Sequence, residues 1–260
     1  MSKDAVKETF SHQGWRLTAA FANKCEACIS PSNHLARILV DEGGLTAPCY
    51  VRPNGINTSL YRDAAPQDSP VEKRPGERFI ISVARLSPEK RQKALIEAMP
   101  HIPDNRIKLV LVGGGPYENE LRMRAAELGV TGRVIFTGMQ PSDKVASLLK
   151  QADVFSLASY HFDNQPMTFL EAASSGLPIV YCDEQMTEGL TERNSVLADG
   201  IEGEDLARAF NGLFSDPERL ERLSLGSLDV ARDFDSTTMA ERMVGLYESL
   251  IRDHRALPYR

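Results

Sequence analysis

Residues 154–181 read VFSLASYHFDNQPMTFLEAASSGLPIVY, and this stretch decides the fold. The apolar run 154–158 predicts a strand, and residues 178–181 predict a second one. Between them, Pro166 suits the first turn of a helix, and Gly176 would end that helix. The stretch therefore predicts a strand, a polar loop, a helix and another strand. In an open parallel sheet, such a loop lies at the carboxyl ends of the strands, where ligands bind.

The same pattern repeats along most of the chain. Apolar strands separated by helical segments are predicted at residues 79–84, 108–112, 134–137, 154–158, 178–181 and 195–197. Their centres recur about every 16 to 29 residues, which is the rhythm of right-handed βαβ crossovers. The predicted fold class is therefore α/β, with a doubly wound, Rossmann-like parallel sheet.

The composition fits an ordinary soluble α/β protein. The chain has 260 residues, 42% of them hydrophobic, and can bury a full core. Its net charge of -6 argues against a nucleic-acid partner. No apolar run reaches membrane-spanning length and the charged N-terminus lacks the core of a signal peptide, so a cytoplasmic protein is predicted. Cys25-x-x-Cys28 has no second pair to complete a zinc site, and the four cysteines are predicted to be reduced structural thiols.

The sequence predicts a small α/β segment, a linker, a sheet-bearing segment and a helical end, at residues 1–60, 61–77, 78–235 and 236–260. The first segment has short strands over 25–30 and 49–52 and a helix over 32–42, too little sheet to stand alone. The linker carries three prolines among charges. The last segment is an amphipathic helix whose apolar face is formed by Met239, Met243, Leu246 and Leu250.

Three places are candidate phosphate sites. Gly113-Gly114-Gly115 follows the second predicted strand, where glycines let the backbone approach a ligand, although a tight turn without ligand has the same sequence. Arg85 and Lys90 follow the first strand and suit a diphosphate, unless they form a solvated basic corner. The third place is the mouth of the helix after Asp163. The glycine turn lacks the third glycine and the later carboxylate of a dinucleotide site, which disfavours an NAD oxidoreductase.

Several motifs together resemble the retaining GT-B glycosyltransferases of glycosyltransferase family 4. They are Pro53-Asn54-Gly55-Ile56-Asn57-Thr58, Ala84-Arg85-Leu86-x-x-Glu89-Lys90, Leu111-Val112-Gly113-Gly114-Gly115-Pro116, Val134-x-Phe136-x-Gly138, Ala152-Asp153-Val154-Phe155 and the segment from Asp163 to Glu171. The resemblance covers residues 25–200. It implies a donor-binding domain over 78–235 and the end of a second Rossmann-like domain over 1–60, followed by a crossover helix.

The resemblance also implies a role for each candidate residue. Arg85 and Lys90 would bind the donor diphosphate, Asp163 would contact the transferred hexose, and Glu171 would hold the ribose hydroxyls. The backbone N–H groups from Met167 onward would face the distal phosphate. The remaining substrate-binding residues implied in this way are Gly114, Gly115, Phe136, Gly138, Gln165 and Thr168, with Phe136 and Gly138 facing the base.

The chain departs from the family pattern in three ways. The family usually has Glu at the position of Asp163. Because Asp has one methylene fewer, its carboxylate reaches about 1.5 Å less far. The family usually has Gly at the place of Pro166, which has no N–H to donate. Family members are also longer by roughly one small domain, so most of the N-terminal domain with its acceptor pocket is expected to be missing.

These observations predict a hexosyltransferase that uses a nucleotide diphosphate sugar and retains configuration, with a UDP-sugar favoured over a GDP-sugar. No cofactor and no metal are expected, because Arg85 and Lys90 supply positive charge. The expected acceptor is a lipid or saccharide of the cell envelope, with the protein at the inner face of the membrane. Self-association through the exposed face of the last helix is also expected. The alternative is a catalytically silent nucleotide-sugar binding module that needs a partner chain.

Overall fold

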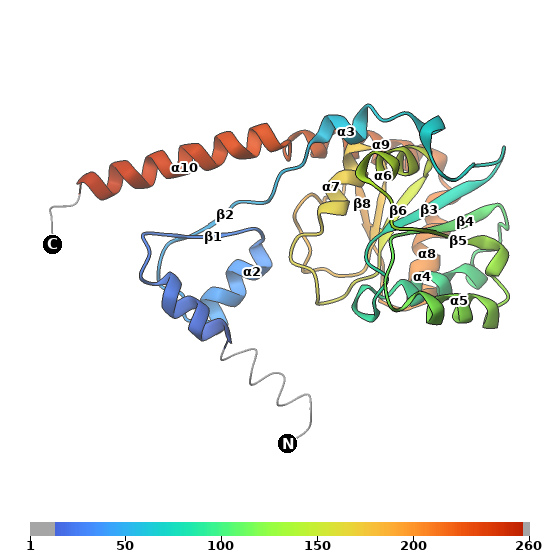
Figure 1. Cartoon of the computed structure of the whole chain (residues 1–260), viewed down its shortest axis with the longest axis horizontal. Coiled ribbons are helices and arrows are strands. Elements are labelled where there is room, and N and C mark those ends of the chain that lie inside the picture. Colours follow the sequence, from blue (N-terminus) through green and yellow to red (C-terminus); the bar gives the residue numbers. More distant parts are fainter. Residues whose placement is uncertain (1–13, 257–260) are drawn as a thin grey trace, which may run out of the picture.

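The protein consists of a large α/β unit and a small N-terminal unit, connected at a hinge from which a long helix extends (Figure 1). The computed structural model describes residues 14–256, with side chains up to residue 253. The predictions for the charged N-terminus and for the tail after residue 256 lie outside the described residues.

A single parallel sheet forms the centre of the large unit. Its strands are β3 (Arg78–Val83), β4 (Ile107–Val112), β5 (Val134–Gly138), β6 (Val154–Leu157), β7 (Ile179–Tyr181) and β8 (Ser195–Leu197). They lie in the order β5-β4-β3-β6-β7-β8. The chain thus moves outward from β3 in one direction and then from β6 in the other, which places a topological switch point between β3 and β6. The predicted doubly wound parallel sheet is confirmed.

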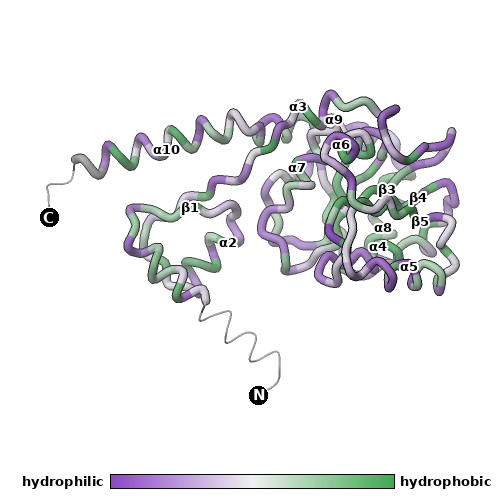
Figure 2. Tube along the Cα trace, in the orientation of Figure 1, coloured by the Kyte–Doolittle hydropathy of each residue, from purple (hydrophilic) through white to green (hydrophobic). Residues whose placement is uncertain are grey.

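Helices cover both faces of this sheet and create two hydrophobic cores. Neighbouring residues of a strand point to opposite faces, so Ile80 belongs to one core and Ile81 to the other. The first core lies under α4 (Gln92–Ala98), α5 (Glu118–Glu127) and α8 (Gly203–Phe214). The second lies under α3 (Thr58–Arg62), α6 (Ser142–Gln151) and α7 (Met167–Ser174). Helix α9 (Pro217–Arg232) packs against α7 and α8. Figure 2 shows the hydrophobic strands β3 and β4 inside this arrangement.

Helix α3 was not expected, because the sequence around it predicts a linker. Asn57 caps the helix by accepting a hydrogen bond from the Leu60 N–H at 3.3 Å. Tyr61, at the start of the predicted linker 61–77, is 7% exposed and belongs to the second core. A 3-10 turn follows at Pro66–Asp68. Tertiary packing therefore decides the conformation of these five helical residues, which have no periodic pattern of their own.

The small unit is a two-stranded parallel sheet with helices on it. Its strands β1 (Cys28–Ser30) and β2 (Cys49–Val51) pair so that Cys28 lies opposite Cys49. Between them, α2 (Asn33–Arg37) continues as a π-helical segment, η1 (Ile38–Glu42). The core of the unit contains Ala19, Leu39 and Leu45. The predicted strands and the predicted helix over 32–42 are present, although β1 is shorter than expected.

The chain passes through the hinge twice, once from the small unit into the large unit and once from the large unit into α10, and the two passages are hydrogen-bonded to each other. The N–H of Ile56 donates to the carbonyl of Phe234 at 3.0 Å, and the N–H of Ser236 donates to the carbonyl of Ile56 at 2.8 Å. Gly55 packs on the second passage so closely that a Cβ there would lie 2.9 Å from Cα of Ser236. The hinge therefore requires glycine at position 55.

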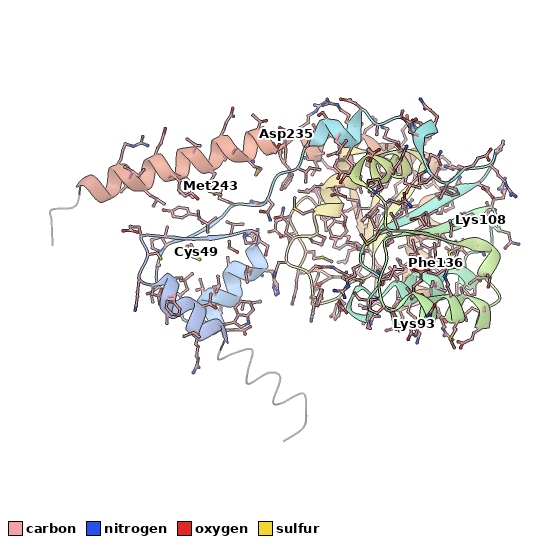
Figure 3. The ribbon with its side chains drawn as sticks, in the orientation of Figure 1. Cys49, Lys93, Lys108, Phe136, Asp235 and Met243 are labelled. Atoms are coloured by element: carbon pink, nitrogen blue, oxygen red, sulfur yellow. The ribbon has the colours of Figure 1, made fainter. Side chains whose placement is uncertain are left out.

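Helix α10 (Ser236–Ala256) starts at this hinge, and its apolar face differs from the expected one. Met239 and Leu246 are only 9% and 7% exposed, so the expectation that they form an exposed face is wrong. They line a groove of about 520 Å³ together with Tyr50 to Pro53 of the small unit. Figure 3 shows Met243 on the same side of the helix. Among the described side chains of α10, the exposed large apolar ones are Val244, Tyr247 and Ile251.

A hydrogen bond at the hinge predicts an acid-dependent contribution to stability. The Thr58 hydroxyl donates to Oδ2 of Asp235 at 2.6 Å, and with the Thr237 N–H it holds the pKa of Asp235 below its usual value. We expect Thr58→Val to lower the thermal midpoint by about 2 to 4 °C at pH 7. These hydrogen bonds stabilise only the ionised carboxylate. The stability difference between wild type and Thr58→Val should therefore fade as the pH drops through the folded-state pKa of Asp235.

Thermal unfolding of wild type, Thr58→Val and the control Thr238→Val over a series of pH values, from pH 7 down to the acid limit of the folded state, measures this effect. A loss of stability that stays the same down to the lowest pH would contradict the assignment to Asp235.

Candidate functional site

The loops at the carboxyl edge of the sheet bring most of the predicted site residues to one side of the large unit. The loops after β3, β4 and β6 carry Arg85 and Lys90, the three glycines, and Asp163, respectively, and Gly138 is the last residue of β5. The loop after β7 contributes residues that the sequence did not indicate. This edge, at the switch point between β3 and β6, is where open α/β sheets bind ligands.

The glycine turn after β4 supports the loop that carries Arg85. A Cβ on Gly113 would lie 2.1 Å from the carbonyl oxygen of Ala84, and a Cβ on Gly115 would lie 2.1 Å from that of Leu86. The Leu86 N–H donates to the carbonyl of Gly114 at 3.1 Å. Gly113 and Gly115 are thus required by close packing of two loops. This packing is independent of the substrate contacts predicted for Gly114 and Gly115.

Lys90 and Asp163 form an ion pair in this site. Nζ of Lys90 lies 2.5 Å from Oδ1 of Asp163, and the two side chains are 19% and 13% exposed. The ring of Phe162 lies 5.2 Å from the same ammonium group. Oδ2 of Asp163 is buried and has no hydrogen-bond partner among the described residues. Arg85 is exposed, and its carbonyl accepts a hydrogen bond from the buried Gln92 at 2.7 Å. The site therefore has an exposed cation, a half-buried ion pair and a carboxylate oxygen that can accept one more donor.

The mouth of α7 offers free backbone donors. Pro166 is the N-cap residue, so its missing N–H removes no donor from the helix itself. The first helical N–H with an acceptor is that of Phe169, which donates to the carbonyl of Pro166 at 3.1 Å. Those of Met167 and Thr168 have no partner among the described residues. The helix N-terminus therefore presents two donors and the positive end of a dipole, which suits an anion.

Glu171 lies in the contact between α7 and α3. Burial raises the pKa of Glu171, a shift that the neighbouring hydroxyl of Tyr61 opposes. Burial and the neighbouring carboxylate also raise the pKa of Tyr61. Tyr61 lies within the segment predicted as a linker, so its contact with Glu171 could not be expected from the sequence.

Gln165 and Phe136 also have partners that the sequence did not suggest. Oε1 of Gln165 accepts from the N–H and from Nδ2 of Asn54, at 2.8 and 3.0 Å. Its Nε2 donates to the carbonyl of Asn54 at 3.1 Å. The ring of Phe136, labelled in Figure 3, lies 4.2 Å from the guanidinium carbon of Arg122. Both predicted substrate-binding side chains are thus half-buried against other parts of the protein.

A second polar contact connects the units through the loop after β7. Oε1 of Glu188 accepts from the N–H and from Nδ2 of Asn33 at 2.8 and 2.9 Å. Glu188 is 7% exposed, and its Oε2 has no partner in the described part of the chain. In the same loop, Asp183 is 1% exposed and accepts a hydrogen bond from the N–H of His161 at 2.7 Å. Neither carboxylate had a sequence signal, because their partners lie in other loops.

Within residues 14–256, no helix is both long and apolar enough to cross a membrane. Over the side chains that the structure describes, no group of three or more His, Cys, Asp or Glu could hold a metal ion.

The sequence and the structure are similar to those of known glycosyltransferases. The family profile "Glycosyl transferases group 1" matches residues 64–226. Alpha-monoglucosyldiacylglycerol synthase of Streptococcus pneumoniae is 28% identical over 236 residues, which cover 87% of this chain and 50% of that protein. A GDP-mannose-dependent alpha-(1-6)-phosphatidylinositol monomannoside mannosyltransferase of Mycobacterium tuberculosis is 31% identical over 189 residues, 68% of this chain and 49% of that protein.

Among solved structures, the Anabaena protein HepE in complex with UDP and glucose superimposes with a TM-score of 0.81 at 23% identity, over 94% of this chain and 69% of that one. At this identity the similarity shows the fold alone, which is the Rossmann-like α/β domain of the GT-B type. The chain spans about half the length of the curated relatives named above. Because the family profile matches more than half of its residues, this chain belongs to the glycosyl transferases group 1 family.

Proposed function

We propose that the chain is the donor-binding part of a hexosyltransferase that takes its sugar from a nucleotide diphosphate sugar and retains configuration at the transferred carbon. The observation that carries the proposal is the convergence of Arg85, Lys90, Asp163 and the N-terminus of α7 at the carboxyl edge of the sheet. Cations and free N–H groups beside an acceptor oxygen suit a diphosphate that is attached to a polyhydroxylated ring.

Each group has a part in the proposed reaction. Arg85, Lys90 and the N–H groups of Met167 and Thr168 bind the diphosphate and stabilise its growing negative charge as the bond to the sugar breaks. These groups can neutralise the leaving group by themselves. Asp163 accepts hydrogen bonds from hexose hydroxyls through its unpartnered Oδ2. When the donor binds, Lys90 gives up part of its contact with Asp163 and contacts the phosphates instead.

The rest of the donor is assigned to the residues around these loops. Glu171 holds the ribose, and Phe136, Gly138, Gly114 and Gly115 surround the nucleotide. We favour UDP over GDP as the nucleotide. We also propose that the chain divides into the end of the acceptor-side domain over 1–60, a linker over 61–77, the donor-binding domain over 78–235 and the crossover helix with its tail over 236–260. The relatives' names support a lipid acceptor, since they name diacylglycerol and phosphatidylinositol glycolipids. We therefore propose a role in cell-envelope glycolipid or polysaccharide synthesis, at the cytoplasmic face of the membrane. Self-association through α10 would use Val244, Tyr247 and Ile251.

Calorimetric titration with UDP, GDP, UDP-glucose, GDP-mannose and NAD tests the proposal. We expect binding of one nucleotide and its sugar, and no binding of NAD. Incubation of the bound nucleotide sugar with diacylglycerol or phosphatidylinositol vesicles then tests transfer, and a product with inverted configuration would contradict retention. A chain that binds none of the nucleotides would contradict the whole proposal.

The two carboxylates should be separable by mutation. Asp163→Asn should leave the affinity for the free nucleotide within about twofold and reduce the preference for the nucleotide sugar about tenfold. Glu171→Gln should weaken both ligands equally, because the ribose is common to them. Calorimetry with the nucleotide and its sugar, and with Glu127→Gln as an exposed control at the far end of α5, measures both. If Asp163→Asn lost as much affinity for the free nucleotide as for the nucleotide sugar, this would show that Asp163 does not contact the hexose.

A further inference from the structure

The loop that carries Asp163 is anchored two residues before and two residues after this carboxylate. On the first side, His161 has a left-handed backbone with a φ of 51°, and its N–H donates to Oδ2 of Asp183 at 2.7 Å. The other oxygen of Asp183 accepts from the N–H of Gln185 at 3.0 Å. A buried carboxylate with both oxygens occupied thus holds a strained residue in place.

On the second side, Gln165 binds the hinge. Two of its three hydrogen bonds with Asn54 use the main-chain N–H and carbonyl of that residue. The side-chain amide of Gln165 therefore pairs with peptide groups, and the pairing depends little on which side chain stands at position 54. Since both ends of the amide are occupied, Gln165 has few free positions for a ligand.

The anchor for Gln165 is itself fixed. Asn54 directly precedes Gly55, which packs on Met239 and Ser236, and Ile56, which is hydrogen-bonded to the second passage through the hinge. Any movement of the hinge will therefore be transmitted to Gln165 and to the loop before α7. Asp163 lies between this anchor and the one at Asp183, so its position depends on the hinge.

We propose that Gln165 is a positioning residue that aligns Asp163 with the donor by docking on the hinge, and that it does not itself bind the donor. Asp183 fixes the other end of the same loop. The arrangement makes hexose recognition sensitive to the relative placement of the two units, while nucleotide recognition is not. This inference rests on the proposed contact between Asp163 and the transferred hexose.

The test uses the full chain with UDP and UDP-glucose, and in parallel with GDP and GDP-mannose. Gln165→Ala should lower the preference for the nucleotide sugar over the free nucleotide about tenfold, with the free nucleotide unchanged within about twofold. Gln165→Glu retains the two hydrogen bonds that Oε1 accepts, so its preference for the nucleotide sugar should lie between those of wild type and Gln165→Ala. Asn54→Ala retains both main-chain bonds and should remain close to wild type. Asp183→Asn should give the same kind of loss as Gln165→Ala.

Hydrogen exchange of the ligand-free protein distinguishes positioning from direct binding. Gln165→Ala should speed exchange over residues 159–165, since an anchor of that loop is lost, and Asn54→Ala should not. Unchanged exchange in Gln165→Ala, or an equal loss of affinity for nucleotide and nucleotide sugar, would overturn the inference. If wild type binds no nucleotide, the proposed function fails, whereas faster exchange in Gln165→Ala would still show that Gln165 anchors the loop.

Discussion

Replacing both Arg85 and Lys90 with alanine is expected to weaken binding of the donor nucleotide about 100-fold. Each cation is expected to contribute one charge-assisted contact to the diphosphate, and the loss of one such contact costs roughly 1.5 to 3 kcal/mol. Solvent and salt screen the exposed Arg85 more than the half-buried Lys90. We therefore expect Lys90→Ala alone to cost more affinity than Arg85→Ala. Calorimetry of the single and double variants measures the three values.

The ion pair complicates Lys90→Ala, because this change leaves the Asp163 carboxylate in a poorly solvated place without its partner. We expect a lower thermal midpoint, which the second change Asp163→Asn should restore without restoring nucleotide binding. Lys93→Ala is the matched control, since Lys93 is 50% exposed on α4 and pairs with Glu97 (Figure 3). If the double variant of Arg85 and Lys90 bound nucleotide as tightly as Lys93→Ala, the diphosphate site would have to lie elsewhere.

Gly115→Ala is expected to destabilise the protein by on the order of 3 kcal/mol, whereas Gly114→Ala should be tolerated. The new methyl group on residue 115 would lie 2.1 Å from the carbonyl oxygen of Leu86, and a backbone atom cannot move aside cheaply. On residue 114 it would lie 3.3 Å from Cγ of Met139, a flexible side chain that is 83% exposed. Two adjacent residues of the same type thus provide their own control.

The same pair of variants tests whether the glycine turn supports the Arg85 loop. Displacement of Leu86 should carry Arg85 with it, so Gly115→Ala should also weaken nucleotide binding in protein that remains folded. Denaturant unfolding together with calorimetry below the thermal midpoint separates the two effects. A stable Gly115→Ala protein would mean that the two loops can move apart, and that the glycines are present for another reason.

The sheet could be predicted from sequence because its buried parallel strands are apolar runs bounded by turn residues. Strand β8 begins and ends where the sequence predicts, and the other strands of the large unit differ by at most one residue at each end. The site loops follow from the same pattern, since each begins where a strand ends. Local sequence therefore placed Arg85, Lys90 and Asp163 at one edge of the sheet.

The contacts across loops and units could not be predicted in this way. Asn54 and Gln165 are 111 residues apart, and their pairing depends on how the hinge is placed against α7. Tyr61 and Glu171 meet only because α3 packs on α7, and a five-residue helix without periodicity gives no local signal. Met239 and Leu246 show a helical period but not what covers them. A pattern of apolar residues reports that a face is buried, whereas the partner is set by tertiary packing.

The paired passages at the hinge have a mechanical consequence. Two chain segments are hydrogen-bonded side by side, at Ile56 with Phe234 and Ser236, and behave as a narrow two-stranded ribbon. Such a ribbon bends readily out of the plane of its hydrogen bonds, but twisting it would distort those hydrogen bonds. Relative movement of the large and small units by bending across this ribbon therefore costs less free energy than movement by twisting it. A single chain passage could not impose such a difference.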